Sequence, residues 1–358
     1  MSPWRNAFRD HRAALWVAGL YSAAVIAEAI FCRVPLAEIS RIFGYLFMSA
    51  MIAVVFAAGL YFVTFIRFFM GGSGAFFARW RNAAGALDIA TRRYLEGERW
   101  TYALVAFLAM SADNFFFMSK SLIATVNPGG KLFWDPVFRD FDHALHFGYP
   151  HEYLIPAVNA LNLAQVLDVS YALWLLVMFF ATGYTIFVER RLLQRLQFLW
   201  TYLLAWIVLG TFGATAFSSV GPLFYGDFIP WPSPYAAVGE NLTRMSEQGF
   251  MFAAKTRDLL LGWAHNDQVF DPNALSAMPS MHLAIAWLLV LYARGISRAA
   301  FAAACAFFAV IFTGSIYLGF HYAVDGYVSV AGVSLIWWGA GRVLKRHHGR
   351  NRLLGAEG

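Results

Sequence analysis

The sequence predicts an all-α integral membrane protein with about eight transmembrane helices, which include a six-helix core. Of its 358 residues, 60% are hydrophobic and only 13% are charged, whereas soluble domains average about 45–50% and about 25%. Eight separate stretches of mostly apolar residues could serve as spans, since a bilayer needs about 20 apolar residues per helix. Two cysteines are too few for a disulfide-stapled secreted domain, and so apolar a chain is not disordered.

The eight expected spans can be read directly from the apolar stretches. No small-residue cleavage site follows the first, so it is interpreted as a helix rather than a signal peptide. The sixth is short only because it is counted from Met281. In chain order the spans are Ala13–Phe31, Ile42–Phe69, Thr101–Val126, Gln165–Val188, Phe198–Ser218, Met281–Tyr292, Ala300–Leu318 and Tyr327–Gly341.

The basic residues predict the orientation of the chain. The N-terminus, the even-numbered connections up to the sixth and the C-terminal tail hold 19 of the 27 lysines and arginines. The positive-inside rule therefore places both termini in the cytoplasm. The same placement explains the net charge of +6 without nucleic acid as a partner.

Three regions are expected along the chain. Residues 1–100 form two helices and a cytoplasmic segment, Gly71–Trp100, which is either an amphipathic helix on the membrane surface or a solvated linker. Residues 101–341 form the catalytic membrane domain, and residues 342–358 form a basic cytoplasmic tail. Two long outer loops, Asn127–Ala164 and Ser219–Pro279, have the length at which loops usually carry function.

A first chemical motif, Ser276–His282, leads into the sixth span. Proline suits the first turn of a helix, so Pro279 predicts a helix start here. The backbone N–H groups of Ser280, Met281 and His282 would then point out of the helix end and form an anion site. His282 would lie in that first turn at the membrane boundary, where it can carry a proton.

A second motif, Gly319–Tyr327, leads into the eighth span. On a helix, His321 and Asp325 would share one face because they are four residues apart. The carboxylate could accept Nδ1–H of the imidazole and leave Nε2 as nucleophile or base. Both motifs would end on the outer face and could meet around one phosphate. The alternative is that the histidines only cap helices at the interface.

These residues resemble a known family. Pro279-Ser280-Met281-His282 followed by His321-Tyr322-Ala323-Val324-Asp325 resembles the type 2 phosphatidic acid phosphatase (PAP2) superfamily, in the branch of fungal inositol phosphorylceramide synthases and related bacterial proteins. His-Tyr-x-x-Asp is also similar to the last motif of sphingomyelin synthases. The segments Ser219–Tyr225 and Phe141–Gly148 resemble elements of the bacterial branch. The resemblance covers about Ser111 to Ala340.

The resemblance implies a role for each matching residue. His321 would attack phosphorus and become phosphohistidine, Asp325 would orient it, and His282 would protonate the leaving oxygen and then deprotonate the acceptor. No metal ion and no cofactor would be needed. Substrate contacts are expected from Ser280, Lys120, Ser315, Tyr322 and Tyr225.

The sequence also departs from the broader family. Ser315 stands where the family has an arginine six residues before the nucleophile, Met281 replaces a glycine, and the Lys-x6-Arg-Pro element is missing, with Gly221-Pro222 near its place. Fewer cations suit a phosphodiester headgroup better than a dianionic monoester. This favours transfer over hydrolysis.

Two further groups leave alternatives open. Lys120 lies within the third span, on the same face as Asp113, and could reach the phosphate; it could equally snorkel to the interface while Asp113 pairs locally with Asn114 or with another helix. The second group comprises Asp140, Asp142, His143, His146 and His151. It could bind zinc through His143 and His146, but we prefer the alternative that it forms a surface helix over the mouth of the active site.

We therefore expect a lipid phosphotransferase of the inositol phosphorylceramide synthase type, in a bacterial inner membrane, with its active site on the extracytoplasmic face. Its partners would be a membrane lipid and a lipid or alcohol acceptor, and not nucleic acid. One alternative is a phosphatase acting on polyprenyl or diacylglycerol phosphate. A transporter or a non-catalytic scaffold would leave both histidine motifs unexplained, and no inverted repeat supports a transporter.

Overall fold

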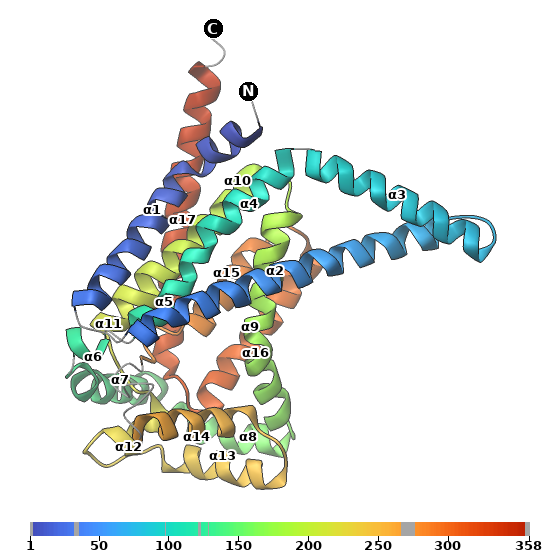
Figure 1. Cartoon of the computed structure of the whole chain (residues 1–358). Coiled ribbons are helices and arrows are strands. Elements are labelled where there is room, and N and C mark those ends of the chain that lie inside the picture. The colour runs from blue at the N-terminus through green and yellow to red at the C-terminus, as the bar shows by residue number, and fades with distance from the viewer. Residues whose placement is uncertain are drawn as a thin grey trace.

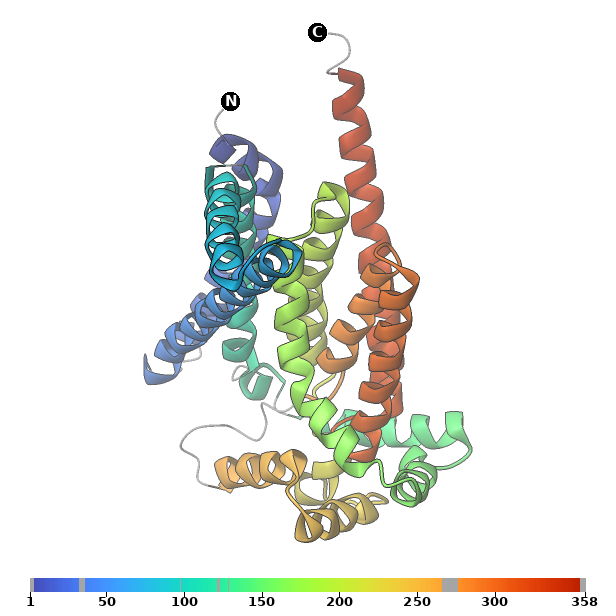
Figure 2. The same cartoon turned by 90° about the vertical axis from the view of Figure 1, so that its right-hand side faces the viewer.

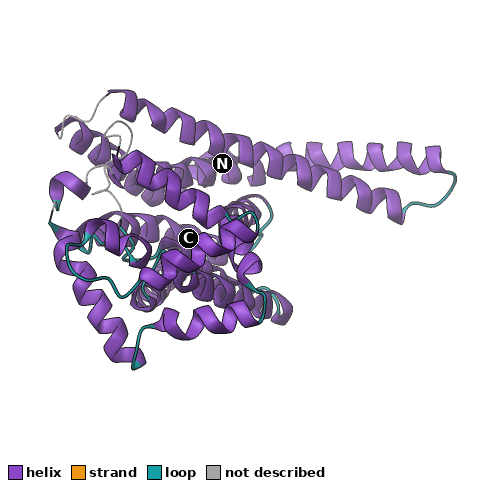
Figure 3. Cartoon of the chain, turned by 90° about the horizontal axis from the view of Figure 1, so that it is seen from below, coloured by secondary structure: helices purple, strands orange, loops and turns teal. Residues whose placement is uncertain are grey.

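The computed structural model describes residues 3–31, 36–96, 98–120, 123–127, 129–265 and 276–354. Throughout these residues the regular structure is helical (Figure 3). Both ends of the chain lie at the same end of the molecule (Figure 1). An even number of crossings, as the charge pattern predicts, has this consequence.

Six helices are long and apolar enough to cross a membrane within the described part of the chain. The fourth of them is continuous through a π-helix, η2 (Ala205–Gly213), and the short α11 (Ala214–Ala216). In chain order, the six candidate spans lie in α1 (Pro3–Phe31), α2 (Leu36–Gly71), α9 (Ala164–Phe187), the helix that starts as α10 (Leu192–Leu204), α16 (Arg298–Tyr317) and α17 (Ala323–Leu354).

The expected third span, Thr101–Val126, is not one helix. It consists of α4 (Glu98–Met110), a 3₁₀ turn η1 (Ser111–Asn114), α5 (Phe115–Lys120) and α6 (Ile123–Val126). The turn coincides with the short polar residues of Ser111–Asn114, whose side chains compete with backbone hydrogen bonds and so weaken a helix interior. Reading the stretch by hydropathy alone overlooked this break.

The expected sixth span is also shorter than a membrane. Helix α15 (Met281–Ala293) begins at Met281 itself and has 13 residues, so it is about 20 Å long, against the roughly 30 Å of a bilayer core. Most of its residues are buried. A helix that is apolar on all sides is typically enclosed by others, and α15 is enclosed by α9, α10, α16 and α17. The count of eight full spans is therefore not confirmed.

The two long outer loops are largely helical, whereas a surface helix was expected only around His143 and His146. Their helices gather at the end of the molecule opposite both termini (Figures 1 and 2), and we call this group the cap. Buried carboxylates bind it to the spans. Asp168 of α9, for example, accepts hydrogen bonds from the N–H groups of Phe252 and Ala253. The cap comprises α7 (Gly130–His146), α8 (Pro150–Ala160), η3 (Pro222–Phe224), α12 (Tyr225–Phe228), α13 (Ala236–Gln248) and α14 (Phe252–His265).

The N-terminal helices form a second, looser region. Helix α3 (Phe76–Glu96) follows α2 and precedes α4 in the chain. It returns alongside α2, and the pair extends away from the other helices (Figure 1). Helix α1 packs against α4. The segment is therefore helical. Whether α3 lies on the membrane surface remains a prediction.

Candidate active site

His321 is held by a backbone carbonyl and a carboxylate. Its Nδ1 lies 2.8 Å from the Ala277 carbonyl oxygen and 3.3 Å from Asp325 Oδ2. Since a carbonyl oxygen only accepts, Nδ1 carries the proton, and in the neutral ring Nε2 has the lone pair. Helix α17 begins at Ala323, so His321 precedes it. The expected meeting on one helical face is wrong, and a turn brings the pair together instead.

Asp325 also stabilises the start of α17. Its Oδ2 accepts a hydrogen bond from the N–H of Tyr322 at 3.0 Å, as a carboxylate three residues into a helix does in a capping box. The side chain is fully buried. One carboxylate oxygen thus fixes both the turn before the helix and the ring of His321.

His282 lies in the first turn of α15 and contacts two aromatic rings of α9. Its ring centroid is 4.4 Å from that of Tyr171, with the planes 18° apart, and 4.3 Å from that of Trp174. Trp174 Nε1 also donates to the His282 carbonyl oxygen at 2.9 Å. These ring contacts orient His282 at the start of α15.

The two histidines meet at one cavity. Their ring centroids are 5.7 Å apart, a separation that one phosphate group can bridge. Both line a cavity of about 710 Å³ with mainly apolar walls from α9, α14, α15 and the π-helix. Its carboxylate and histidine lining residues, among those the structure describes, are Asp113, Asp168, His282 and His321. The cap contributes to the wall through α14 and through Phe224 of η3. The helix with His143 and His146, expected over the mouth, supplies none of the described lining residues.

Helix α15 starts two residues later than Pro279 predicts. Ser280 is its N-cap, and Ser280 Oγ accepts a hydrogen bond from Leu283 N–H at 3.3 Å. Pro279 therefore precedes the helix, in a loop that Ser219 holds through Ala277 N–H and Met278 N–H. The first-turn N–H groups of Met281 and His282 are the ones that a helix N-terminus offers to an anion.

Asp135 of α7 joins the Ser219–Tyr225 segment to the second motif. It accepts from Val220 N–H at 2.8 Å, Gly221 N–H at 3.0 Å and the Tyr322 hydroxyl at 2.7 Å. Burial raises the pKa of the Asp135 carboxyl to about 6, against these three hydrogen bonds, which favour its charged form. Tyr322, expected at the substrate, is buried and its hydroxyl supports this junction.

Asp142 caps α17 from outside. Its two oxygens accept from Ala323 N–H at 2.8 Å and Val324 N–H at 2.9 Å. On the same helix, His146 bonds through Nδ1 to the Asp142 carbonyl and through Nε2 to the Tyr327 hydroxyl. Within the described residues no group of three or more histidines, cysteines or carboxylates is placed to hold a metal ion.

The other expected substrate contacts lie apart from the cavity lining. Tyr225 is fully buried, and its hydroxyl accepts from Arg139 Nη1 at 2.9 Å. Ser315 is also buried; its carbonyl accepts from His321 N–H at 3.2 Å, so it supports the histidine through the backbone. The Lys120 side chain lies outside the described residues. Asp113 accepts from the Tyr202 hydroxyl at 2.7 Å, a partner on another helix.

Sequence reasoning missed Tyr171, Trp174 and Asp135. An aromatic pair three residues apart is ordinary in an apolar span, and nothing local links it to a histidine more than 100 residues later. Asp135 follows a tryptophan in what looked like a loop. The available sequence signal was the pair of glycines, Gly221 and Gly319, in these loops. In the structure both have positive φ, and a Cβ at Gly221 would lie 2.8 Å from the Phe320 carbonyl oxygen, so the loops pack closely here.

Comparison with known proteins gives one result. A family model described as the PAP2 superfamily matches residues 137–340, more than half of the chain. The matched range contains both histidine motifs, the cap from Val137 onward and helices α9 to α16. No curated protein and no solved structure matches the chain.

Proposed function

The chain belongs to the PAP2 superfamily, whose members are phosphatases and phosphotransferases, and on this premise we propose that it transfers a phosphate-containing headgroup between membrane lipids. One observation carries the proposal: two imidazoles 5.7 Å apart at a largely apolar cavity of about 710 Å³. Such a cavity suits a lipid chain, and such a histidine pair suits attack and proton transfer at one phosphorus.

In the first step, His321 Nε2 attacks phosphorus as the bond from phosphorus to the leaving lipid oxygen breaks. That oxygen takes a proton from His282, which acts as general acid. The Ala277 carbonyl and Asp325 hold Nδ1–H and stabilise the positive charge that the ring gains. The first-turn N–H groups of α15 would face the developing charge on the phosphoryl oxygens.

In the second step, the acceptor oxygen attacks phosphorus and the N–P bond to His321 breaks. Neutral His282 now accepts the proton of the acceptor hydroxyl, so that both histidines return to their starting forms. A lipid alcohol as acceptor gives headgroup transfer. Water as acceptor gives hydrolysis, which is the alternative function, with a polyprenyl or diacylglycerol phosphate as substrate.

The charge of the site supports transfer. No lysine or arginine is among the described residues that line the cavity, and Ser315 stands at the position of a family arginine. A phosphodiester carries one negative charge, so it needs fewer cations than a dianionic monoester. The inositol phosphorylceramide synthase-like assignment, the inner-membrane location and the outward-facing site belong to this proposal.

The test is a turnover assay with the purified full-length protein. A phosphodiester lipid labelled in its headgroup is supplied with and without a lipid alcohol, and a labelled lipid phosphate is supplied separately. Headgroup exchange is expected in wild type and absent in His321→Ala. Release of inorganic phosphate alone would favour the phosphatase, and activity that survives in His321→Ala would overturn the mechanism.

A matched control is available in the cap. His143→Ala removes an exposed histidine of α7 and should leave turnover unchanged. A rapid alkaline quench adds a direct readout, because phosphohistidine is stable in alkali and labile in acid. Label should attach to wild-type protein and not to His321→Ala.

A further inference from the structure

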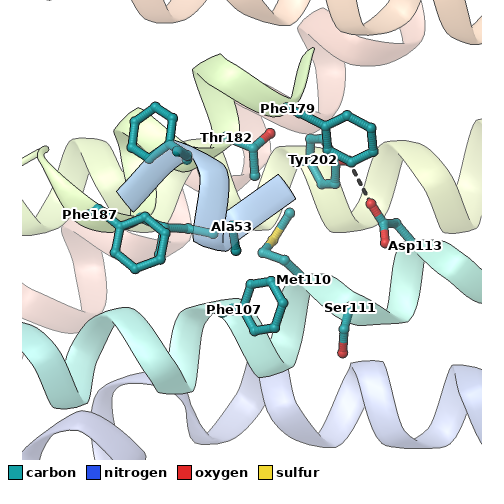
Figure 4. A pocket seen from close by; sticks show the side chains of 12 residues that line it. Ala53, Phe107, Met110, Ser111, Asp113, Phe179, Thr182, Phe187 and Tyr202 are labelled. Carbon is teal, nitrogen blue, oxygen red and sulfur yellow. Dashed lines mark hydrogen bonds between the residues drawn. The ribbon is translucent and has the colours of Figure 1, made fainter. Parts of the chain in front are cut away.

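A second cavity, which we call the inner cavity, shares part of its lining with the active-site cavity. Two residues, Asp113 and Phe179, line both. The inner cavity is smaller, about 50 Å³, and α2 closes it with Ala53 and Phe56. Figure 4 shows Asp113 beside Tyr202, with Phe179 and Thr182 from α9 facing them. The two cavities therefore meet at a carboxylate.

This junction lies well below the histidines. Tyr171 stacks on His282, and Phe179 of the same helix is eight residues further along α9, which corresponds to about 12 Å at the rise of an α-helix. A lipid chain that starts from a phosphate at the histidines and follows α9 would reach Asp113 part-way along its length.

The polar groups here are unusual for their surroundings. Asp113 Oδ2 accepts from the Tyr202 hydroxyl at 2.7 Å, and Asp113 is only partly buried and lines both cavities. Thr182 lines the inner cavity and Trp206 the outer one. Ionisable residues at membrane depth are costly and typically face a functional cavity. A carboxylate that served only to join helices would be enclosed between them.

The backbone is irregular on both sides of the junction. Asp113 lies in the 3₁₀ turn η1, and the π-helix η2 begins three residues after Tyr202. Irregular backbone is tolerated within a membrane where it lines a cavity or is buried in protein, and π-helical segments are frequent at functional sites. Both breaks border the outer cavity, where Gly210 packs closely on Phe116.

We propose that the Asp113–Tyr202 pair binds a hydroxyl group carried part-way along the hydrocarbon chain of the lipid substrate. The inference rests on the proposed function and names the class of lipid that the same site would select. An apolar chain would leave the carboxylate without a polar contact from the ligand, whereas a hydroxyl at this depth donates a hydrogen bond to it.

The proposal also assigns a purpose to the N-terminal part of the chain. Asp113, Ala53 and Phe56 all precede residue 137, where the family match begins. The family core supplies the histidines, and the preceding helices supply the carboxylate and the inner wall. Chain selectivity would therefore come in part from outside the family core, since Tyr202 lies within the matched residues.

The experiment measures binding, so it does not depend on turnover. Full-length His321→Ala protein in lipid nanodiscs is titrated with the methyl ester of octadecyl phosphate, which is a phosphodiester and is called octadecyl phosphate below, and with its analogues hydroxylated at carbon 10 or carbon 2. The carbon-10 hydroxyl lies at about the depth of Asp113 in an extended chain, and the carbon-2 hydroxyl lies near the phosphate. We expect the carbon-10 analogue to bind at least tenfold more tightly, as one hydrogen bond to a carboxylate allows, and the carbon-2 analogue to match octadecyl phosphate.

The variants separate recognition from folding. Asp113→Leu should abolish the preference without weakening octadecyl phosphate, and Asp113→Asn, which keeps one acceptor oxygen, should reduce it. Ser111→Ala is the matched control, because Ser111 lies in the same turn, lines the same inner cavity and donates its hydroxyl to the Leu108 carbonyl. A hydroxyl lost from the wall, with the carboxylate kept, should retain the preference. If Asp113→Leu does not fold, the asparagine variant decides alone.

Three results would overturn the inference: equal binding of the three lipids, a preference that survives in both Asp113 variants, or no binding of any of them. None of these bears on His321, because the proposed function is judged by turnover in the wild-type protein.

Discussion

Helix α15, with His282 in its first turn, and helix α17, which starts just after His321, begin in different electrostatic surroundings. At the start of α17, Asp142 accepts from Ala323 and Val324 N–H groups, and Asp325 accepts from Tyr322 N–H. At the start of α15, the capping side chain is the neutral hydroxyl of Ser280. Two carboxylates thus accept hydrogen bonds at the start of α17, whereas the capping group at the start of α15 is uncharged.

This difference divides the work of the site. Negative side chains at α17 repel a phosphate from that helix end but stabilise the positive charge that His321 gains during attack. The uncharged cap at α15 leaves the helix dipole there to favour an anion. In the proposed mechanism, the nucleophile therefore lies just before α17 and the phosphate-binding end belongs to α15, with the two histidine rings 5.7 Å apart.

The largest expected effect is on turnover, and it distinguishes the roles of His321 and His282. His321→Ala should lower turnover by at least about 10⁴-fold, since it removes the nucleophile. His282→Ala should also be slow with ordinary lipids, but should still form phosphohistidine from a substrate whose leaving group needs no proton, such as a nitrophenyl phosphodiester. Trapped label on His282→Ala and not on His321→Ala is the check; the reverse pattern would exchange the two roles.

The cap on α17 should matter next. Asp142→Ala leaves two buried N–H groups without their acceptors, so we expect a loss of roughly 2–3 kcal/mol in unfolding free energy and at least tenfold in turnover, measured by thermal unfolding and assay. Asp140→Ala provides the control: its side chain is 67% exposed and paired with Arg139 at the surface, and such pairs contribute about 1 kcal/mol or less. Equal losses in the two variants would contradict the division between the helix ends.

The α15 end can be probed through the aromatic contact. Trp174→Leu should lower kcat by about 10–100-fold with little change in KM, because a displaced acid slows the reaction more than binding. Trp174→Phe keeps a ring face while losing the Nε1–H donated to the His282 carbonyl, and should recover much of the rate. A rise in KM with unchanged kcat would show that Trp174 binds substrate instead of positioning His282.

The smallest effect is a pH dependence from Asp135. Its folded-state pKa of about 6 exceeds the unfolded value near 3.9, so its stabilising contribution is fully present below pH 4 and is lost as the pH rises through 6. Between pH 7 and pH 5, wild type should gain about 1 kcal/mol relative to Asp135→Asn, which does not titrate. Unfolding midpoints of both proteins over this range test it; parallel curves would contradict it.

Much of the molecule could be predicted from periodicity and motif spacing. The long apolar spans recur as helices, and His282 and His321 do meet, because each motif lies at the same end of an apolar helix. The broken third span and the short α15 could not be predicted by hydropathy, which counts apolar residues and ignores the turn-forming side chains of Ser111–Asn114. A surface helix was expected around His143 and His146, but the other cap helices were missed, because polar, proline-containing segments resemble loops until tertiary carboxylates such as Asp168 fix their ends.

The sequence by itself determined a helical membrane protein and the places of the two histidine motifs along the chain. The tertiary structure alone decided what surrounds them: the carbonyl of Ala277 at His321, the rings of α9 at His282, and the carboxylate of Asp113 where two cavities meet. The physical reason is range. Apolar periodicity and helix-end residues act within a few positions of the chain, whereas each of these contacts joins residues 40 or more positions apart, and only packing in three dimensions brings them together.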